Sequence, residues 1–375
     1  MTKPSRTSPA NNNNERTNAQ RLLQLWAVGG NWGATPFSID PYFLHPMGLR
    51  TLQTRYYFLG LGILYCIVAS PKKAKKMEYE SINFMDFKRR FDSQEACLQA
   101  IYDYRWPRGF VCPHCQHDDG HRVSKRHVYQ CVLCRRQTSI TAGTLFHKTK
   151  IPLMKWFSLI FLMSQDKGGI SAVRAANLLG MHYTTVWNMM HKIREAMTKK
   201  LEHEMLSGFV EIDDALYGGR IKGKPGRALQ NKRPVVVMVE RLKHGAGDAA
   251  FVVLHNQSGD AFKQAVMRHV EPMTHIRTDG YPHNNVLYNV GKLNMETIGQ
   301  VYSEEGPLKN VDRVISLSKR FLLGTFHQYC ARAHLARFLA EYTFRFNRRY
   351  RWCQLFSRVV AACALCPPVP YAAIS

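Results

Sequence analysis

The sequence is short of negative charge, and its ten cysteines are thinly spread. Only 27 of its 375 residues are Asp or Glu, against 52 Lys and Arg, which leaves a net charge of +25. Because such an excess repels itself in a compact protein, we expect an anionic partner, and nucleic acid is the leading candidate. An apolar stretch at residues 56–69 is shorter than the roughly 20 residues that a membrane-spanning helix needs. We therefore expect no membrane partner.

Ten cysteines in a chain of this length are too few for a disulfide-rich secreted scaffold. Four of them form two C-x2-C pairs, Cys112 with Cys115 and Cys131 with Cys134, with fifteen residues between the pairs. Each pair is typical of a tight knuckle that directs two thiolates at one point, and four thiolates complete a closed tetrahedral site. The spacing predicts a structural Zn²⁺ site in a reducing compartment.

The residues around the two knuckles predict a small zinc ribbon that depends on its metal to fold. Apolar residues alternate with polar ones near the pairs, as in short strands. His114 and His117 could replace a cysteine as ligands, but we expect them at the surface. The surrounding cations favour phosphate contact over a merely solvated face. They are Arg105, Arg108, Arg122, Lys125, Arg126, Arg135 and Arg136. A later pair, Cys363 and Cys366, has no second pair nearby and is interpreted as incidental.

Between residues 151 and 201 the apolar spacing predicts three helices. The first covers 154–163. Ser171 caps the second, in which Val173, Ala176 and either Leu179 or Leu178 face the inner side, and Gly180 ends it. The third runs from 182 to about 199. Its predicted buried stripe is Val186, Met189, Met190, Ile193 and Met197.

A short helix, a turn at glycine and a longer helix are typical of a helix-turn-helix that places side chains in the major groove of DNA. An ordinary three-helix bundle is the alternative. On the helix-turn-helix interpretation, the residues that contact DNA are His182, Thr184, Thr185, Asn188 and Lys192.

After Gly208 the pattern becomes extended, with strands predicted over 209–213, 234–239 and 250–254. Ser258 caps a helix that reaches residue 269, and a fourth strand covers 274–278. Three antiparallel strands followed by a helix, a strand and further helices are typical of an RNase H-like mixed-sheet α/β domain. With the ribbon and the three helices, the fold class predicted is multidomain α+β.

The first and fourth strands lie side by side in such a sheet, so Asp213 and Asp279 should converge. Asp312, on a later helix, is placed to be the third carboxylate. Three neighbouring carboxylates repel one another unless cations neutralise them, and hard cations such as Mg²⁺ or Mn²⁺ prefer oxygen ligands. The pattern therefore predicts a catalytic site for two metal ions. Other acids compete for these roles, namely Glu211, Asp214, Glu304 and Glu305.

A segment between the first two strands, residues 218–233, contains six basic residues and no acidic one. It is either a DNA-gripping loop or a solvated flexible one. On the first interpretation Arg220, Lys222 and Lys224 contact DNA.

The predicted domain boundaries follow these changes of pattern. Residues 1–76 form a disordered or non-native extension, because they contain little periodic structure and Met77 is a candidate native start. A zinc ribbon with a leading helix covers 77–146, and the helix-turn-helix region covers 147–205. The catalytic domain covers 206–350, and a C-terminal tail covers 351–375.

The chain resembles the ISXO group of insertion-sequence transposases, which combine a zinc ribbon with a DDE, RNase H-like domain. The likeness extends from about Phe91 to Arg349. It is carried by the stretches Arg105–Cys115, Thr141–Phe146, Val210–Asp213, Thr278–Gly280, Lys319–His327 and Phe344–Arg349.

The resemblance implies that Asp213, Asp279 and Asp312 are the catalytic carboxylates. It also implies that Lys319, His327 and Arg345 to Arg349 lie near the active site or the DNA backbone, and Lys319, Arg348 and Arg349 are the DNA contacts that we select. The sequence departs from the family pattern in two places. Asp214 stands where such proteins usually have Glu, and the third acid is Asp rather than Glu or His.

We therefore expect a transposase that binds terminal inverted repeats and catalyses metal-dependent strand cleavage and strand transfer. Its partners would be double-stranded DNA, at both the element ends and the target, and further copies of itself in a synaptic complex. It would act in the bacterial cytoplasm, associated with the nucleoid. The alternatives are a DNA-binding regulator with a degenerate catalytic domain and a non-transposing RNase H-like nuclease.

Overall fold

The computed structural model describes residues 55–57, 65–67, 79, 81–123, 127–218, 232–279, 286–287, 294–298, 308–327 and 333–374. The chain divides into two compact units, Met1–Pro71 and Lys72–Ser375. In the first unit, β1 (Arg55–Tyr57) pairs antiparallel with β2 (Tyr65–Ile67). Apart from these two strands, the predicted extension over residues 1–76 lies outside the described residues, as does Met77. The same holds for Glu304, Glu305 and the predicted DNA contacts Arg220, Lys222 and Lys224.

The second unit begins with helices whose starts are set by side-chain caps. Asn83 caps α2 (Phe84–Arg90) and Ser93 caps α3 (Gln94–Arg105), each accepting a hydrogen bond from a backbone N–H in the first turn. The ribbon strands follow as a three-stranded antiparallel sheet in the order β3–β4–β5. Their bounds are Gly120–Val123, Val128–Cys131 and Gln137–Ser139.

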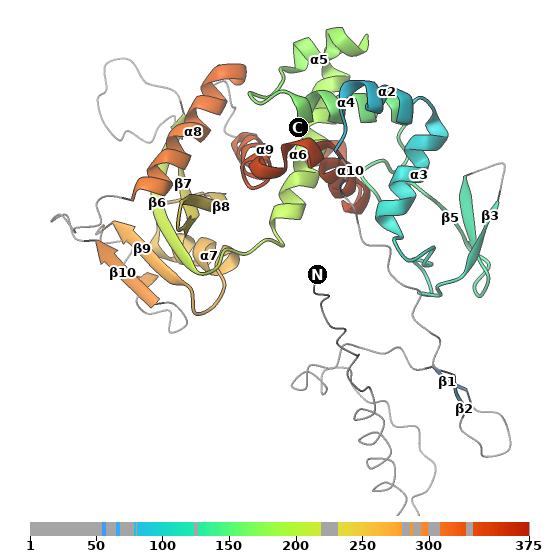
Figure 1. The fold of residues 1–375 in the computed structure, drawn as a ribbon, viewed down its shortest axis with the longest axis horizontal. Helices are drawn as coiled ribbons and strands as arrows, with labels where there is room; N and C mark the ends of the chain where they lie inside the picture. The colour runs from blue at the N-terminus through green and yellow to red at the C-terminus, as the bar shows by residue number, and fades with distance from the viewer. Residues whose placement is uncertain are drawn as a thin grey trace, which may run out of the picture. The chain divides into compact units, whose positions relative to one another are not determined.

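The three helices predicted between 151 and 201 are present as α4 (Leu153–Gln165), α5 (Ala172–Leu179) and α6 (Tyr183–Leu201) (Figure 1). Ser171 caps α5 as predicted, and Gly180 ends it in the left-handed region, at φ 58°, which favours glycine. All five residues of the predicted stripe on α6 are buried. The prediction for Val173 was wrong, because 58% of this residue is exposed and Ala175 takes the inner position instead.

One hydrophobic core joins the ribbon, α2 to α6 and α10 (Leu355–Leu365). At its centre, Phe87 of α2 stacks on Phe161 of α4 with ring centroids 4.4 Å apart, and Phe356 of α10 packs edge-on against Phe87. Residues 355–365, which the sequence analysis assigned to a C-terminal tail, therefore form a helix that is buried over most of its length. Cys363 is fully buried within it.

The largest sheet is mixed and has the strand order β10–β9–β6–β7–β8. The three consecutive strands β6 (Phe209–Gly218), β7 (Lys232–Leu242) and β8 (Gly245–Val253) are antiparallel. In contrast, β9 (His275–Asp279) runs parallel to β6, and β10 (Asn294–Ile298) runs parallel to β9. The fourth predicted strand thus lies beside the first, as the sequence analysis expected.

Helices cover both faces of this sheet. On one face, α7 (Gly259–His269) packs Phe262 and Val266 against a core that includes Ile212 of β6. On the other face, α8 (Lys309–Phe326) and α9 (Leu335–Phe346) pack against a core that includes Ala215 and Tyr217. Strand alternation therefore directs the odd-numbered residues of β6 toward α8 and the even-numbered ones toward α7.

Short 3₁₀ turns at Arg349–Gln354 and Tyr371–Ala373 complete the second unit.

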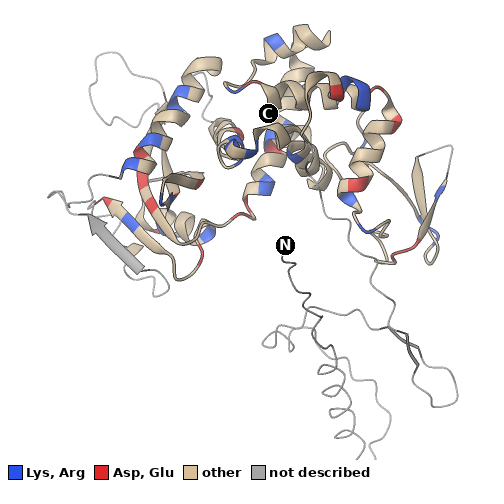
Figure 2. Ribbon diagram, in the orientation of Figure 1, with Lys and Arg blue, Asp and Glu red and all other residues tan. Residues whose placement is uncertain are grey.

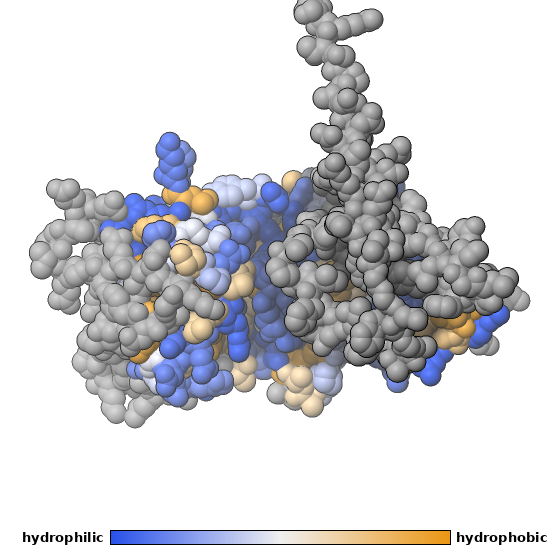
Figure 3. Space-filling view, turned by 90° about the horizontal axis from the view of Figure 1, so that it is seen from below, coloured by the Kyte–Doolittle hydropathy of each residue, from blue (hydrophilic) through white to orange (hydrophobic). Residues whose placement is uncertain are grey.

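Within the described part of the chain, none of the helices combines the length and apolar character required to cross a membrane. On the face seen in Figure 3, the described surface is mostly hydrophilic and its hydrophobic residues form small patches. Single apolar residues at a surface are ordinary in proteins and need no partner to explain them.

Candidate metal and DNA sites

The four predicted cysteine ligands come together in the ribbon. Their sulfur atoms all lie within 4.8 Å of one another. Cys112 Sγ lies 3.6 Å from Cys134 Sγ, and Cys115 Sγ lies 3.5 Å from Cys131 Sγ. Two thiols from each knuckle thus face one point, which is the donor set and the arrangement that a closed structural zinc site requires.

The two knuckles have the same local geometry. In each, the residue after the second cysteine takes a left-handed conformation, Gln116 at φ 59° and Arg135 at φ 58°. Their backbone N–H groups donate to the carbonyl of the first cysteine of the pair, at 2.9 Å for Cys112 and 3.1 Å for Cys131. Burial opposes ionisation of Cys112, but N–H groups of its own knuckle outweigh it and lower its pKa to about 7. For Cys115, the backbone N–H of His117 lowers the pKa, but burial and the neighbouring thiols of Cys134, Cys131 and Cys112 outweigh it and raise the pKa to about 12. The loop geometry thus favours the thiolate form that binds a metal at Cys112 but not at Cys115.

The cations predicted around the ribbon differ in their availability. Arg105 donates to the carbonyl oxygens of Ser139 and Ile140, so it joins α3 to the ribbon. Arg122 contacts Glu95 and His127. Arg136 contacts His114 by its Nη1, with 3.0 Å to the ring Nδ1, while its side chain remains exposed. Lys125 and Arg126 lie outside the described residues.

Three of the five residues predicted to contact DNA from the third helix lie at the start of α6. His182 and Thr184 are exposed and hydrogen-bond to each other at 2.9 Å, and Thr185 is half-buried. Asn188 and Lys192 are also half-buried, and the buried Oδ1 of Asn188 has no hydrogen-bond partner among the described residues. Among the five predicted contacts, the exposed side chains are therefore those at the N-terminal end of the helix.

Two of the three predicted carboxylates lie on neighbouring parallel strands. Ile212 of β6 pairs with Thr278 of β9, so Asp213 and Asp279 are each one residue beyond a paired position. Neighbouring strands are separated by about 4.8 Å. Ile212 of β6 and Ile276 of β9 point into the core under α7. Because side chains alternate along a strand, Asp213 and Asp279 lie on the opposite face, which α8 covers. The topology of the sheet alone therefore brings these two acids side by side.

Asp312 lies in the first turn of α8, which packs against β6. Burial, reinforced by the charges of Asp279, Asp214 and Asp312 and opposed by the hydrogen bond from the Asp214 backbone, raises the pKa of Asp213 to about 7. Burial and the charge of Glu211 raise the pKa of Asp312. The three acids thus interact electrostatically, and a cation would relieve their mutual repulsion.

The oxygen atoms of these acids are not gathered as tightly as the cysteine sulfurs. Among the described residues, the four cysteines are the only group of three or more His, Cys, Asp or Glu residues whose ligand atoms all lie within 4.8 Å of one another. In chemistry the carboxylates fit a hard divalent cation. Binding of such an ion would have to draw their oxygens closer than they lie in the structure.

Glu211, one of the competing acids, is bonded to the start of α8. Its side chain is 3% exposed, and its two oxygens accept hydrogen bonds from the backbone and side chain of Asn310 and from the backbone of Val311. Strand alternation could predict its face, but nothing in the sequence indicates that a helix start would occupy it. Asp214 donates its backbone N–H to Asp213 Oδ1 at 2.8 Å.

The cations that the family resemblance placed near the acids have different environments. Lys319 is exposed on α8, and its Nζ lies 5.5 Å from the centre of the Tyr217 ring. Burial of part of the side chain lowers its pKa, while the charge of Asp213 opposes this shift. Figure 2 shows further Lys and Arg along α8, close to acidic residues on β6 and at the start of α8. Lys319 is therefore near the acids and accessible.

The arginines near the end of α9 instead contact the protein. Arg345 is 4% exposed and bonds Glu341, and Arg348 is 9% exposed, pairs with Glu204 at 2.5 Å and covers the Phe344 ring. Arg349 donates to the carbonyls of Phe346 and Ala246. His327 ends α8 in a left-handed conformation and is exposed.

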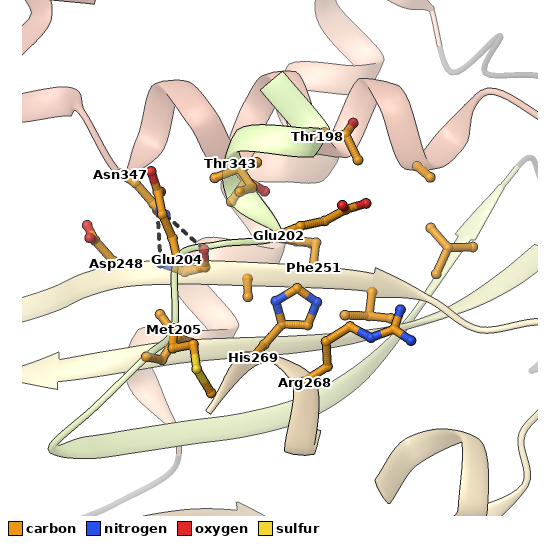
Figure 4. Close-up of a pocket in the computed structure, with 18 residues that line it drawn as sticks. Thr198, Glu202, Glu204, Met205, Asp248, Phe251, Arg268, His269, Thr343 and Asn347 are labelled. Carbon is orange, nitrogen blue, oxygen red and sulfur yellow. Dashed lines mark hydrogen bonds between the residues drawn. The ribbon is translucent and has the colours of Figure 1, made fainter. Parts of the chain in front are cut away.

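None of the predicted site residues lines a cavity of about 270 Å³ in the second unit (Figure 4). It is bounded by the end of α6, the outer edge of β8, the end of α7 and α9. Beside it, the Asn347 amide pairs with the free edge of β8, donating to the carbonyl of Ala249 and accepting from its N–H. No carboxylate of the predicted catalytic set lines this cavity.

Two protein families match the chain. A family model described as an ISXO2-like transposase domain matches residues 205–347, and another described as a transposase zinc-ribbon domain matches residues 92–137. The chain is also 23% identical over 211 residues to "Uncharacterized protein in transposable element ISH50" of Halobacterium salinarum. That match covers 52% of this chain and 69% of the relative.

Two solved structures are similar to the chain at a low level. "Crystal structure of a pre-cleavage Mos1 transpososome" has a TM-score of 0.25 and 11% identity, covering 55% of this chain and 76% of that chain. "Crystal structure of the Mos1 Strand Transfer Complex" has a TM-score of 0.19 and 11% identity, covering 52% and 76% respectively. Similarity this low has no bearing on the fold or the site.

Proposed function

Since its two matched domains make the chain a member of the ISXO2-like transposases, we propose that it binds the terminal inverted repeats of an insertion sequence and cleaves and joins DNA strands there. The observation that carries the proposal is the position of Asp213 beside Asp279, on neighbouring strands, within electrostatic range of Asp312. Carboxylates gathered in this way are costly without a cation, which supports a metal-dependent function over a purely structural one.

The three aspartates would hold two Mg²⁺ or Mn²⁺ ions. When bound, these ions would activate the attacking water or 3′-hydroxyl and stabilise the leaving 3′-oxygen. Asp213 would be the central ligand, because it is the carboxylate that the charges of both other acids reach. Lys319, exposed and close to Asp213, would contact a backbone phosphate of the bound strand.

DNA recognition would come from the modules before the sheet. We propose that α5 and α6 act as the helix-turn-helix, with His182, Thr184 and Thr185 in the groove, because His182 and Thr184 are the exposed side chains among the five predicted contacts. Structural Zn²⁺ on the four cysteines would stabilise the ribbon. Arg348 and Arg349 are weaker candidates for DNA contact, since their guanidinium groups are already bonded within the protein.

Two further features belong to the same proposal. Two element ends must be held together for strand transfer, so the active form would be a homo-oligomer. The protein would act where its DNA is, at the nucleoid in the bacterial cytoplasm. The domain limits of the sequence analysis, with the catalytic domain at 206–350, are retained as part of the proposal.

The test is Mg²⁺-dependent cleavage and joining of DNA that carries the element ends. We compare the wild type with Asp213→Asn and Asp279→Asn, which keep the side-chain shape, and with Asp260→Asn as a matched control on the exposed first turn of α7. Both site variants should bind the DNA in a mobility-shift assay and yield no cleavage product, while the control should cleave like the wild type.

Two results would contradict the proposal. Cleavage that survives both site substitutions would mean that the acids are wrongly assigned. A wild type that binds the element ends but never cleaves them would favour a DNA-binding regulator with a degenerate catalytic domain.

A further inference from the structure

Glu211 has the environment of an anchor rather than of a free carboxylate. It lies on β6, two residues before Asp213 and on the same face. Its Oε2 accepts from the backbone N–H groups of Asn310 at 2.9 Å and Val311 at 3.1 Å, and its Oε1 accepts from Asn310 Nδ2 at 2.9 Å. Both oxygens are thus bonded within the protein, and the side chain is buried.

These contacts form a cap for α8 supplied by a different element. The N-cap residue of α8, Leu308, makes no side-chain cap hydrogen bond, so the first turn lacks a local acceptor. A carboxylate at a helix N-terminus also interacts favourably with the helix dipole. Asp312 follows Val311 directly, so the cap fixes the backbone immediately before the third acid.

A second contact between the same two elements lies farther along. The Tyr217 hydroxyl is 2.6 Å from Ser318 Oγ, and both residues are buried. Because Ser318 Oγ donates to the carbonyl of Ile315, the Tyr217 hydroxyl is the donor in this pair. Along β6, Asp213 lies between Glu211 and Tyr217, and along α8, Asp312 lies between Val311 and Ser318. The two contacts therefore hold α8 on β6, one before and one after the positions of Asp213 and Asp312.

We propose that Glu211 is a positioning residue for the carboxylate site, and that it sets the position of Asp312 relative to Asp213 without being a metal ligand. Tyr217 assists it through Ser318. The inference rests on the proposed metal-dependent function and deepens it, since it names the residue that fixes the geometry of that site. Partners that orient metal ligands from outside the ligand shell typically change metal affinity by about 10- to 100-fold when they are removed.

The experiment measures Mn²⁺ binding to the zinc-loaded, full-length, DNA-free protein by electron paramagnetic resonance, with Mn²⁺-dependent cleavage assayed in parallel. The variants are Glu211→Ala, Glu211→Gln and Tyr217→Phe, and Asp213→Asn serves as the reference for loss of a ligand. Glu240→Ala is the matched control, because the Glu240 carboxylate also accepts two backbone N–H groups, from Ser207 and Asp248, but at the other side of the sheet.

We expect Glu211→Ala to weaken Mn²⁺ binding by about tenfold or more. Glu211→Gln should fall between Glu211→Ala and the wild type, because its amide oxygen can still accept a backbone N–H. Tyr217→Phe should weaken binding less than Glu211→Ala does, and the control should bind Mn²⁺ like the wild type. Thermal melting of each variant identifies any general loss of folding, and Glu211→Gln and Tyr217→Phe keep the test valid if Glu211→Ala does not fold.

Three outcomes would overturn the inference. If both Glu211 variants bind Mn²⁺ with wild-type affinity, only the inference about Glu211 is overturned, and the proposed function stays intact. Loss of binding in Glu211→Gln as complete as in Asp213→Asn would make Glu211 a ligand. A wild type that binds no Mn²⁺ and does not cleave would overturn both the inference and the proposed function.

Discussion

Removing the carboxylate of Glu341 should be among the most destabilising single changes in this protein. Glu341 of α9 is fully buried between two arginines. Its Oε2 accepts from Arg194 Nε of α6 at 2.8 Å, and its Oε1 accepts from Arg345 Nη2 at 3.0 Å. Arg345 also donates to the carbonyls of Met163 and Asp166 at the end of α4. One buried anion thus joins three helices.

The magnitude follows from burial. Arg194 is 2% exposed and Arg345 is 4% exposed, so Glu341→Ala leaves two guanidinium charges without solvent and without their counterion. Breaking a buried ion pair by removing one partner costs about 3–5 kcal/mol. Natural domains are stable by about 5–15 kcal/mol in total, so a loss of this size is a large share.

The measurement is urea unfolding of the zinc-loaded protein, followed by tryptophan fluorescence. Glu195→Ala is the matched control, because Glu195 pairs with Arg337 between the same two helices at 3.1 Å while both side chains are partly exposed. We expect the control to cost at most about 1 kcal/mol. If Glu341→Ala costs no more than Glu195→Ala, then water or a neighbouring group compensates the two arginines and the argument from burial is wrong.

Two further predictions concern the metal and the pH. Removal of Zn²⁺ by a chelator should speed amide hydrogen exchange in β3, β4 and β5 but not in β6 or β7, and added Zn²⁺ should reverse it; unchanged exchange in the ribbon would contradict a structural role for the metal. Burial, reinforced by Arg194, His334 and Arg337, lowers the pKa of His191 to about 2. At pH values below about 6.5, the ordinary pKa of histidine, the unfolded chain therefore binds a proton at His191 that the folded protein does not bind. The free energy of unfolding should then fall by about 1.4 kcal/mol for each unit by which the pH is lowered. In His191→Phe, urea unfolding between pH 6 and pH 4 should show a slope shallower by that amount, and equal slopes would refute the assignment.

The elements that the sequence predicted well are those specified by local patterns. Ser171, Gly180 and Ser258 act as caps and stops where the sequence indicated, because capping depends on residues within one turn. The position of Asp213 and Asp279 on neighbouring strands was also predictable, since it follows from the order of the strands. A one-residue slip would have turned these acids to opposite faces of the sheet.

The features that the sequence did not indicate depend on contacts between distant segments. Residues 355–365 have an apolar composition, but only the packing of Phe356 against α2 and α4 explains why they form a buried helix. Glu211 could be placed on the face of Asp213, but its role depends on a helix that begins about a hundred residues later. Such pairings have no local pattern that reveals them.

The basic composition of the chain illustrates the difference between a class of partner and a binding residue. A net charge of +25 predicts an anionic partner for the whole molecule. It does not say which cations reach that partner, because Arg194, Arg345 and Arg348 are buried and bonded to carboxylates of the protein. Lys319, by contrast, is exposed beside the acids. Burial therefore divides the cations into those that hold helices together and those that remain available for DNA, and mutation of the first group should reduce stability before it reduces affinity.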